Sequence, residues 1–154
     1  MDPVELLLAV EEIKQLKYRY LRTLDLKRWD DFAAVFVPEV TADYGEGLAF
    51  GSRDELVAFM RDSLGQRMVT LHQCHHPEID VDGDRATGVW YLEDKVLMPD
   101  HRLVLEGAAF YEDRYVRTGE GWRIEHTGYR RTYEATMSMD DVPSYALTIG
   151  KAYE

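Results

Sequence analysis

Two residues that lie far apart in the chain, Asp25 and His72, have the side chains that proton abstraction requires. Asp25 follows a tyrosine-rich segment, and His72 lies in a run of residues typical of a strand. A carboxylate that orients an imidazole makes a general base that works near neutral pH, without a metal or a cofactor. The pair can do this chemistry only if the fold brings the two side chains together.

The elements that must position this pair are expected in two blocks, with the boundary at Gly65. Helices are predicted at 3–25, 29–36 and 52–64, because apolar residues recur there at helical spacing. A strand is predicted between the second and third helices, at 40–44. Turn signals after Gly65 separate four further strands, at 69–81, 86–98, 103–117 and 122–133. Helices segregated from antiparallel strands indicate an α+β fold.

The composition favours one globular domain and argues against several classes of partner. The 154 residues can build a single core, and 45% of them are hydrophobic. A formal net charge of −11 disfavours nucleic acid and anionic membrane surfaces as partners. One cysteine, Cys74, excludes an internal disulfide and suits a reducing compartment, and neither a signal peptide nor a membrane-spanning stretch is recognisable. We therefore expect a single cytoplasmic domain over residues 1–154.

A set of motifs, in order and spacing, resembles the SnoaL-like branch of the nuclear-transport-factor-2-like superfamily. The motifs are Tyr-x4-Asp at 20–25, Trp-Asp-Asp-Phe at 29–32, His72 followed by 77–84, Gly-Trp-Arg-Ile at 121–124 and Tyr-Arg-Arg at 129–131. The resemblance covers roughly residues 4–134 and leaves a C-terminal tail at 135–154. It implies a cone-shaped α+β barrel, in which a curved antiparallel sheet packs on three N-terminal helices. The open end of that cone is expected to contain a deep, mostly apolar pocket.

The resemblance also implies roles for the pair. Scytalone dehydratase, bile-acid 7α-dehydratase and hexachlorocyclohexane dehydrochlorinase are similar in pairing a first-helix Asp with a strand His, and Asp25 and His72 match those positions. Tyr20 is similar to the tyrosine that precedes the aspartate in the bile-acid enzyme. The dehydrochlorinase has a lysine where Tyr20 stands, which argues against haloalkane chemistry here. His72 is expected to be the base, Asp25 its orienter, and Tyr20 a hydrogen-bond donor.

Two further catalytic positions follow from the same resemblance. The arginine expected on the last strand is Arg131, with Arg130 as the alternative. It can bind an anionic group or stabilise developing negative charge. The acidic residue expected on the strand after the histidine is Asp94, with Glu93 as the alternative. The period of two along a strand places Asp94 on the same face as Trp90, and a bulge would reverse that choice.

The remaining candidates are residues that either line the pocket or belong to the core. By strand parity, Cys74 and His76 share a face with His72. Three such residues can bind zinc, but same-face neighbours on one strand are ~6.6–7 Å apart, so we expect no metal. Tyr44, Trp90 and Tyr129 fit a flat, multi-ring substrate if they face the cone interior, and otherwise they pack in the core.

The favoured function is that of a cofactor-independent lyase, a dehydratase acting on a polyketide- or steroid-like hydroxylated metabolite. An isomerase uses nearly the same groups. The alternative from another class is a non-catalytic small-molecule-binding or oligomerisation module, because this fold supports many functions. The expected partners are a small-molecule substrate and further copies of the chain, as a homodimer or homotrimer.

Overall fold

The computed structural model describes residues 2–153. Its three helices are α1 (Pro3–Asp25), α2 (Trp29–Ala33) and α3 (Arg53–Ser63). The six strands are β1 (Phe36–Asp43), β2 (Ala49–Phe50), β3 (Val69–Asp82), β4 (Arg85–Met98), β5 (Leu103–Thr118) and β6 (Gly121–Ser138). Short 3-10 turns η1 (Pro99–His101), η2 (Met139–Asp141) and η3 (Lys151–Tyr153) complete the chain. The predicted three helices and four long C-terminal strands are confirmed, but two strands, β1 and β2, lie between α2 and α3 where one was predicted, and α2 ends at Ala33 rather than at residue 36.

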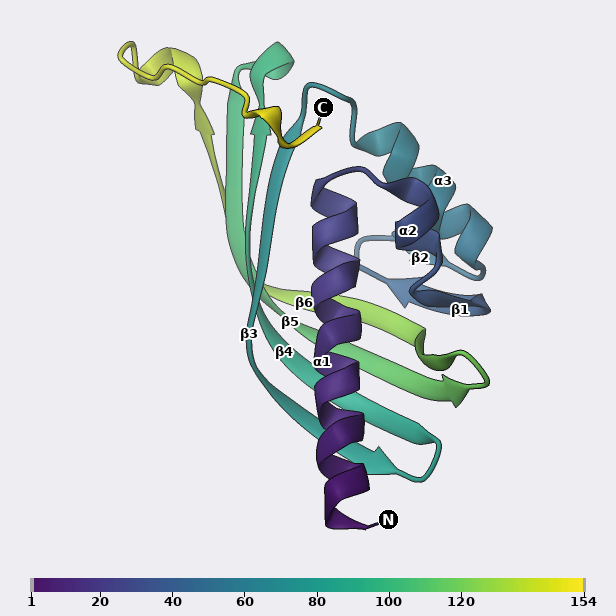
Figure 1. Ribbon diagram of the computed structural model, residues 1–154. Helices are drawn as coiled ribbons and strands as arrows, with labels where there is room; N and C mark the ends of the chain where they lie inside the picture. The colour runs from purple at the N-terminus through teal and green to yellow at the C-terminus, as the bar shows by residue number, and fades with distance from the viewer. Residues whose placement is uncertain (1, 154) are drawn as a thin grey trace.

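The strands form one curved sheet in the order β2-β1-β6-β5-β4-β3. Helix α1 lies along the concave face, while α2 and α3 lie beside its C-terminal end (Figure 1). The predicted α+β class is therefore confirmed, with one difference in the sheet. Strand β1 pairs with β6 in parallel, for example Thr41 with His126, so the sheet is mixed rather than antiparallel throughout. No hairpin joins these two strands, and a long connection permits either direction.

The core lies between α1 and the concave face. Along β4 the residues from Arg85 to Lys95 alternate strictly between exposed and buried, as expected for a strand with one solvated face. Trp90 and Leu92 point inward and are fully buried, whereas Tyr91 is on the outer face. This parity places the β4 residues of the site below on the inside or the outside of the sheet.

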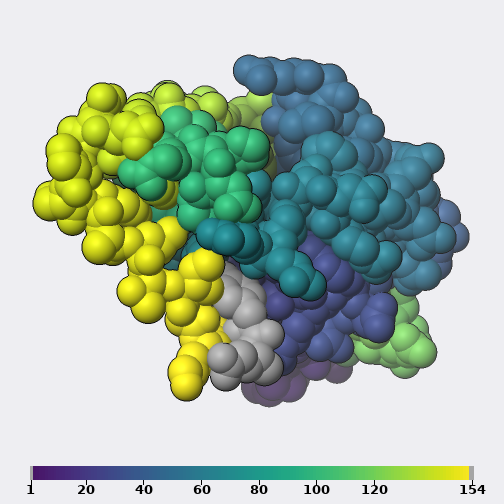
Figure 2. All heavy atoms as spheres, turned by 90° about the horizontal axis from the view of Figure 1, so that it is seen from above, coloured from purple at the N-terminus to yellow at the C-terminus, as the bar shows by residue number. Residues whose placement is uncertain are grey.

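The C-terminal part of the chain is more regular than its sequence indicates. Strand β6 continues to Ser138, five residues beyond the predicted end of the last strand. After β6, residues 139–152 run beside the β4–β5 connection, opposite the end of α3, as Figure 2 shows from above. Within the described residues, no helix is both long enough and apolar enough to span a membrane.

Candidate active site

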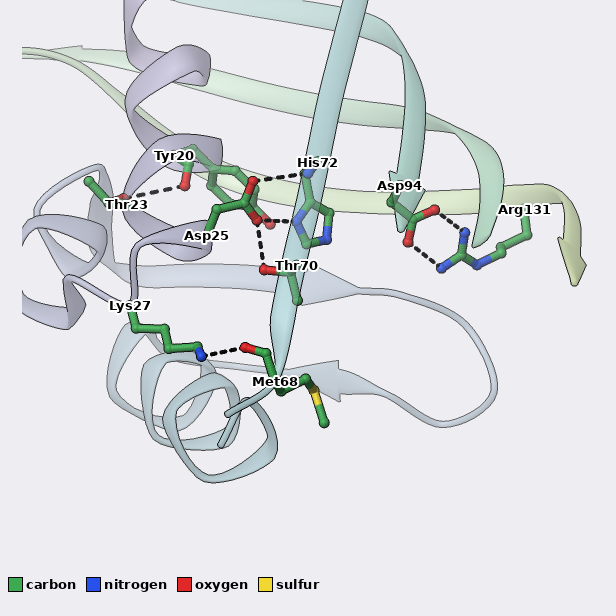
Figure 3. Close-up of polar contacts among 9 residues, drawn as sticks. All are labelled: Tyr20, Thr23, Asp25, Lys27, Met68, Thr70, His72, Asp94 and Arg131. Carbon is green, nitrogen blue, oxygen red and sulfur yellow. Dashed lines mark hydrogen bonds and ion pairs between the residues drawn. The ribbon is translucent and has the colours of Figure 1, made fainter. Parts of the chain in front are cut away.

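Asp25 and His72 meet at the C-terminal end of α1. His72 Nδ1 lies 2.6 Å from Asp25 Oδ1, and the backbone N–H of His72 donates to Asp25 Oδ2 at 2.9 Å (Figure 3). Asp25 is the last residue of α1, and His72 is the fourth residue of β3. The helix end therefore presents its carboxylate directly to the neighbouring edge strand. The contact between Asp25 and His72 that was predicted from the sequence is therefore formed.

This contact fixes which ring nitrogen of His72 is free. A carboxylate only accepts hydrogen bonds, so Nδ1 must carry the proton that the Asp25 contact uses. In the neutral ring Nε2 then has the lone pair. Figure 3 places Nε2 on the side of the ring away from Asp25 and toward Asp94. The side chain of His72 is 13% exposed, so Nε2 is positioned to take a proton from a bound molecule.

Thr70 is a third member of the site that the sequence analysis missed. Its hydroxyl donates to Asp25 Oδ1 at 2.8 Å. The Asp25 carboxylate thus accepts three hydrogen bonds, two of them from side chains and one from the backbone of β3. Three donors hold both carboxylate oxygens in place, so the imidazole has a fixed orientation. Strand parity could have indicated Thr70, because it lies two residues before His72 and therefore on the same face of the strand.

Lys27 attaches the chain that leads into β3 to the end of α1. Its ammonium donates to the carbonyl oxygens of Gly65 at 2.8 Å and Gln66 at 3.0 Å, and also to that of Met68. Its backbone has φ of +56°, the left-handed conformation that ends many helices. Burial lowers the pKa of this ammonium. These contacts hold the segment that leads into β3 next to the end of α1. The last of the three carbonyls belongs to Met68, two residues before Thr70.

Asp94 and Arg131 form a second polar pair on the inner face. Arg131 Nη1 and Nη2 donate to the two Asp94 oxygens at 2.6 and 2.8 Å, and Arg131 Nε lies 3.1 Å from Glu134. Asp94 is the direct cross-strand neighbour of His72. The Asp94 side chain is only 3% exposed, and its hydrogen bonds raise the pKa of Arg131. Inward orientation was the reason for preferring Asp94 over Glu93, and Asp94 does point inward, where Arg131 meets it.

Glu93 and Arg130, the alternatives to Asp94 and Arg131, lie on the outer face of the sheet. Glu93 is exposed and lies 3.9 Å from His75, on the outer face. Arg130 is exposed as well, and its Nη2 contacts Asp43 at 2.9 Å. Neither side chain can reach His72, because successive residues of a strand point to opposite faces.

Tyr20 lies in the hydrophobic core. Its side chain is fully buried, and its hydroxyl shares a 2.9 Å hydrogen bond with the hydroxyl of Tyr44. Burial, reinforced by the neighbouring Tyr111, raises the pKa of Tyr20 well above its usual value. Tyr44 is also buried, and its ring lies 5.1 Å from that of Tyr129. One of these two hydroxyls donates to the other, which is the packing alternative for both residues.

An ion pair that the sequence did not indicate lies deeper in the core. Lys17 Nζ is 2.7 Å from Asp113 Oδ2, and both side chains are 0% exposed. Asp113 also accepts hydrogen bonds from Tyr115 at 2.8 Å and Thr127 at 2.7 Å. The ammonium lies 3.4 Å from the centre of the Tyr111 ring, which is favourable for a cation. The ion pair and the ring compensate a positive charge that would otherwise be costly to bury, and the two hydroxyls add to the stabilisation of the Asp113 carboxylate.

The other predicted pocket residues divide between core and surface. Trp90 is fully buried and donates to Tyr115, so it is a core residue. Cys74 points inward, and burial raises its pKa to about 11, which keeps the thiol protonated at neutral pH. Tyr129 is half-buried, and the centre of its ring lies 5.2 Å from the guanidinium carbon of Arg131, so it contacts the polar pair.

His76 departs from the predicted parity. The register of β3 against β4 shifts between His75 and Glu78, and His76 has φ of +27°. This bulge turns the imidazole to the outer face, where its ring lies 5.9 Å from that of Tyr91. The expectation that His76 shares a face with His72 is therefore wrong. Among residues 2–153, no group of three or more His, Cys, Asp and Glu side chains is arranged to hold a metal ion.

The inner face is open to solvent next to the polar groups. Val96, two residues beyond Asp94, is half-buried, and so is its cross-strand partner Leu105. On β6, Glu134 is the neighbour of Gly107, the β5 partner of Asp94, and Thr136 is the neighbour of Leu105. Both β6 residues are exposed. A hollow of about 320 Å³ lies further out, between the end of α3 and η1. The strand surface beside Asp94 and Arg131 is therefore partly apolar and partly exposed to solvent.

Comparison with known proteins identifies the family. The family model of the SnoaL-like domain matches residues 5–128. Proteins from Mycobacterium tuberculosis and Mycobacterium bovis, both named as uncharacterized, are 34% identical over 115 residues, which is 73% of this chain and 78% of theirs.

Solved structures with the same fold include two with named activities. A hexachlorocyclohexane dehydrochlorinase of type 2 superposes with a TM-score of 0.77 at 16% identity, over 88% of this chain and 93% of that one. A provisionally assigned scytalone dehydratase from Novosphingobium aromaticivorans has a TM-score of 0.76 at 19% identity, over 84% of this chain and 87% of that one. At these identities the likeness shows the fold alone. The match of the family model over most of the chain, together with the mycobacterial relatives, shows that this protein belongs to the SnoaL-like domain family.

Proposed function

We propose that this protein is a cofactor-independent lyase that dehydrates a medium-sized, largely apolar hydroxy ketone, such as a polyketide- or steroid-like metabolite. The observation that carries the proposal is the 2.6 Å contact between Asp25 and His72, which leaves Nε2 as the basic nitrogen. The fold that this chain shares with a dehydrochlorinase and a provisional dehydratase supports a reaction of the elimination type.

The first part of the reaction is proton removal from the carbon beside the carbonyl. His72 Nε2 takes this proton, and the ring becomes an imidazolium that still donates from Nδ1 to Asp25. The Asp25 carboxylate stabilises that positive charge, and its bonds to Thr70 and the backbone keep it from rotating away. The carbonyl oxygen gains negative charge at this stage and can accept from the N–H groups of Arg131 that its carboxylate partners leave free.

The second part is loss of the hydroxyl from the next carbon. The electron pair left by the proton forms the carbon–carbon double bond while the carbon–oxygen bond breaks. The His72 imidazolium returns its proton to the departing oxygen, so the products are an enone and water. This route needs no separate acid, which suits a site in which the Tyr20 hydroxyl is bonded to Tyr44 in the core.

The proposal is tested with 3-hydroxy-1-tetralone, a bicyclic β-hydroxy ketone. Loss of water from it gives an enone that tautomerises to 1-naphthol, which is fluorescent. We expect the purified chain to accelerate 1-naphthol formation, and the His72→Ala variant to form it at the rate of buffer alone. Circular dichroism and the thermal midpoint of unfolding check that the variant is folded.

Two results would contradict dehydration. If the wild-type chain gives no acceleration, or if His72→Ala retains it, the dyad is not a dehydration catalyst for this substrate class. Deuterium incorporation at C2 from heavy water, without 1-naphthol, would instead indicate an isomerase that moves the same proton.

The second candidate is a non-catalytic small-molecule-binding or oligomerisation module. One observation favours it: the Tyr20 side chain is fully buried and its hydroxyl shares a hydrogen bond with Tyr44, so the hydroxyl that was expected to donate to a substrate is engaged in the core. Binding of 3-hydroxy-1-tetralone without turnover would favour this candidate. The homodimer or homotrimer and the cytoplasmic location stay predictions.

A further inference from the structure

We propose that Asp94 makes this site select uncharged ligands, because it occupies the arginine that would otherwise bind an anion. The inference rests on the proposed function, since it specifies the substrate class of the same site. Asp94 acts through Arg131, so it is a specificity-determining residue and not a catalytic one.

The geometry of the pair leaves Arg131 little capacity for an anionic ligand. Planar guanidinium groups bind carboxylates best through two parallel N–H bonds. Arg131 already makes such a pair with Asp94, at 2.6 and 2.8 Å, and its Nε faces Glu134. A ligand carboxylate would have to displace the carboxylate of Asp94, whose side chain is buried and only 3% exposed.

The pairing depends on a glycine in the strand between the two residues. Gly107 of β5 is the cross-strand neighbour of Asp94 on one side and of Glu134 on the other. A Cβ atom at this position would lie 2.4 Å from Arg131 Nη1 and 2.7 Å from the Tyr133 carbonyl oxygen. The absence of a side chain therefore lets the guanidinium cross β5 and reach Asp94. A glycine inside a strand often marks such a close approach.

The charges that face this part of the site add up to a negative value. Asp25, Asp94 and Glu134 contribute three negative charges, and Arg131 contributes one positive charge while His72 is neutral. The next cation inward, Lys17, is paired with Asp113 at 2.7 Å. A ligand carboxylate would thus meet net repulsion, whereas a ketone or hydroxyl needs only a hydrogen bond. The site favours neutral oxygen groups on electrostatic grounds.

The test uses two ligands of almost equal shape, 2-acetylnaphthalene and 2-naphthoate. The methyl group of the ketone is replaced in 2-naphthoate by the second oxygen of the carboxylate. Their dissociation constants are measured at pH 7 by isothermal titration calorimetry. We expect wild-type protein to bind the ketone at least about tenfold more tightly than the carboxylate, because one charge-assisted hydrogen bond is worth a factor of this size. Asp94→Asn keeps the shape of the side chain but removes its charge, and it should tighten 2-naphthoate binding by about tenfold or more on the same basis.

Glu134→Gln is the matched control. It removes one negative charge from the same arginine but leaves the paired bonds to Asp94 in place, so the preference for the ketone should change by less than about threefold. Binding of 2-acetylnaphthalene should stay within about threefold of wild type in both variants, because the ketone has no charge to repel.

The proposal is overturned if wild-type protein binds 2-naphthoate as tightly as the ketone, or if Asp94→Asn leaves their ratio unchanged. It is also overturned if neither ligand binds, since a neutral bicyclic ketone is the class that it names. Binding does not require turnover, so the two proposals fail separately. A chain that discriminates between these ligands but forms no 1-naphthol would keep the charge selection and lose the lyase function.

Discussion

Replacement of Asp25 by asparagine is expected to lower kcat for 1-naphthol formation by up to about 10⁴-fold, the size of effect that the same change has in a serine protease triad. The amide can offer an N–H to His72 Nδ1, which a carboxylate never does. Nδ1 would then accept, and Nε2 would carry the proton and could no longer act as a base. KM should change little, because Asp25 supports the ring and does not contact the substrate.

A matched control removes only one of the bonds that hold the Asp25 carboxylate. Thr70→Val deletes the hydroxyl that donates to Oδ1 and leaves the contact with His72 in place. Its kcat should fall by no more than about tenfold, the value of one hydrogen bond. A kcat for Asp25→Asn within tenfold of wild type would show that the carboxylate does not set the tautomer of His72.

Replacement of Asp113 by alanine is expected to give a large loss of stability, about 3–5 kcal/mol in the free energy of unfolding. The change leaves the Lys17 ammonium buried without its countercharge, and it removes the acceptor of Tyr115 and Thr127. Urea denaturation, followed by circular dichroism, measures the difference.

Two further variants distinguish the cost of an unpaired charge from the loss of packing. Replacing both partners with apolar residues, Lys17→Met with Asp113→Leu, should recover much of the lost stability, because no charge remains buried. Glu106→Ala breaks an exposed pair with Lys95 and should cost less than about 1 kcal/mol. Equal destabilisation by Asp113→Ala and Glu106→Ala would contradict this account of the core.

The dyad was predictable because its two residues are specified by local patterns. Asp25 stands at the end of a strongly periodic helix, and His72 lies in a strand bounded by clear turn signals. Family spacing supplied the reason to connect them. Strand parity then placed Asp94 correctly, because β4 alternates without a bulge over this stretch. Local periodicity and one resemblance were therefore enough for the main polar groups.

Other parts of the site depend on tertiary geometry that no local pattern records. The bulge before Glu78 reversed the face of His76, and the one local sign of it is Pro77, because a proline inside a strand is typical of a bulge or an edge strand. The partners of Tyr20 and Lys17 are Tyr44 and Asp113, which approach only when the sheet curves around α1. Residue type alone could not distinguish a Tyr20 that contacts substrate from one that is bonded to another tyrosine.

The sheet itself was partly predictable for the same reason. Hairpin turns fix the antiparallel neighbours from β3 to β6, and these were expected from the sequence. The parallel pairing of β1 with β6 joins segments at opposite ends of the chain, so no turn indicates it. Gly107 could be noticed as a glycine inside a strand, but the guanidinium that fills its space comes from another strand.

The most direct test of the central claim is a double-mutant cycle on the rate of 1-naphthol formation, with wild type, Asp25→Asn, His72→Ala and the double variant. If Asp25 acts only through His72, the double variant should be no slower than His72→Ala alone, because the orienting group has nothing left to orient. Additive losses, with the double variant slower than His72→Ala by the full Asp25→Asn factor, would contradict a single Asp25–His72 base.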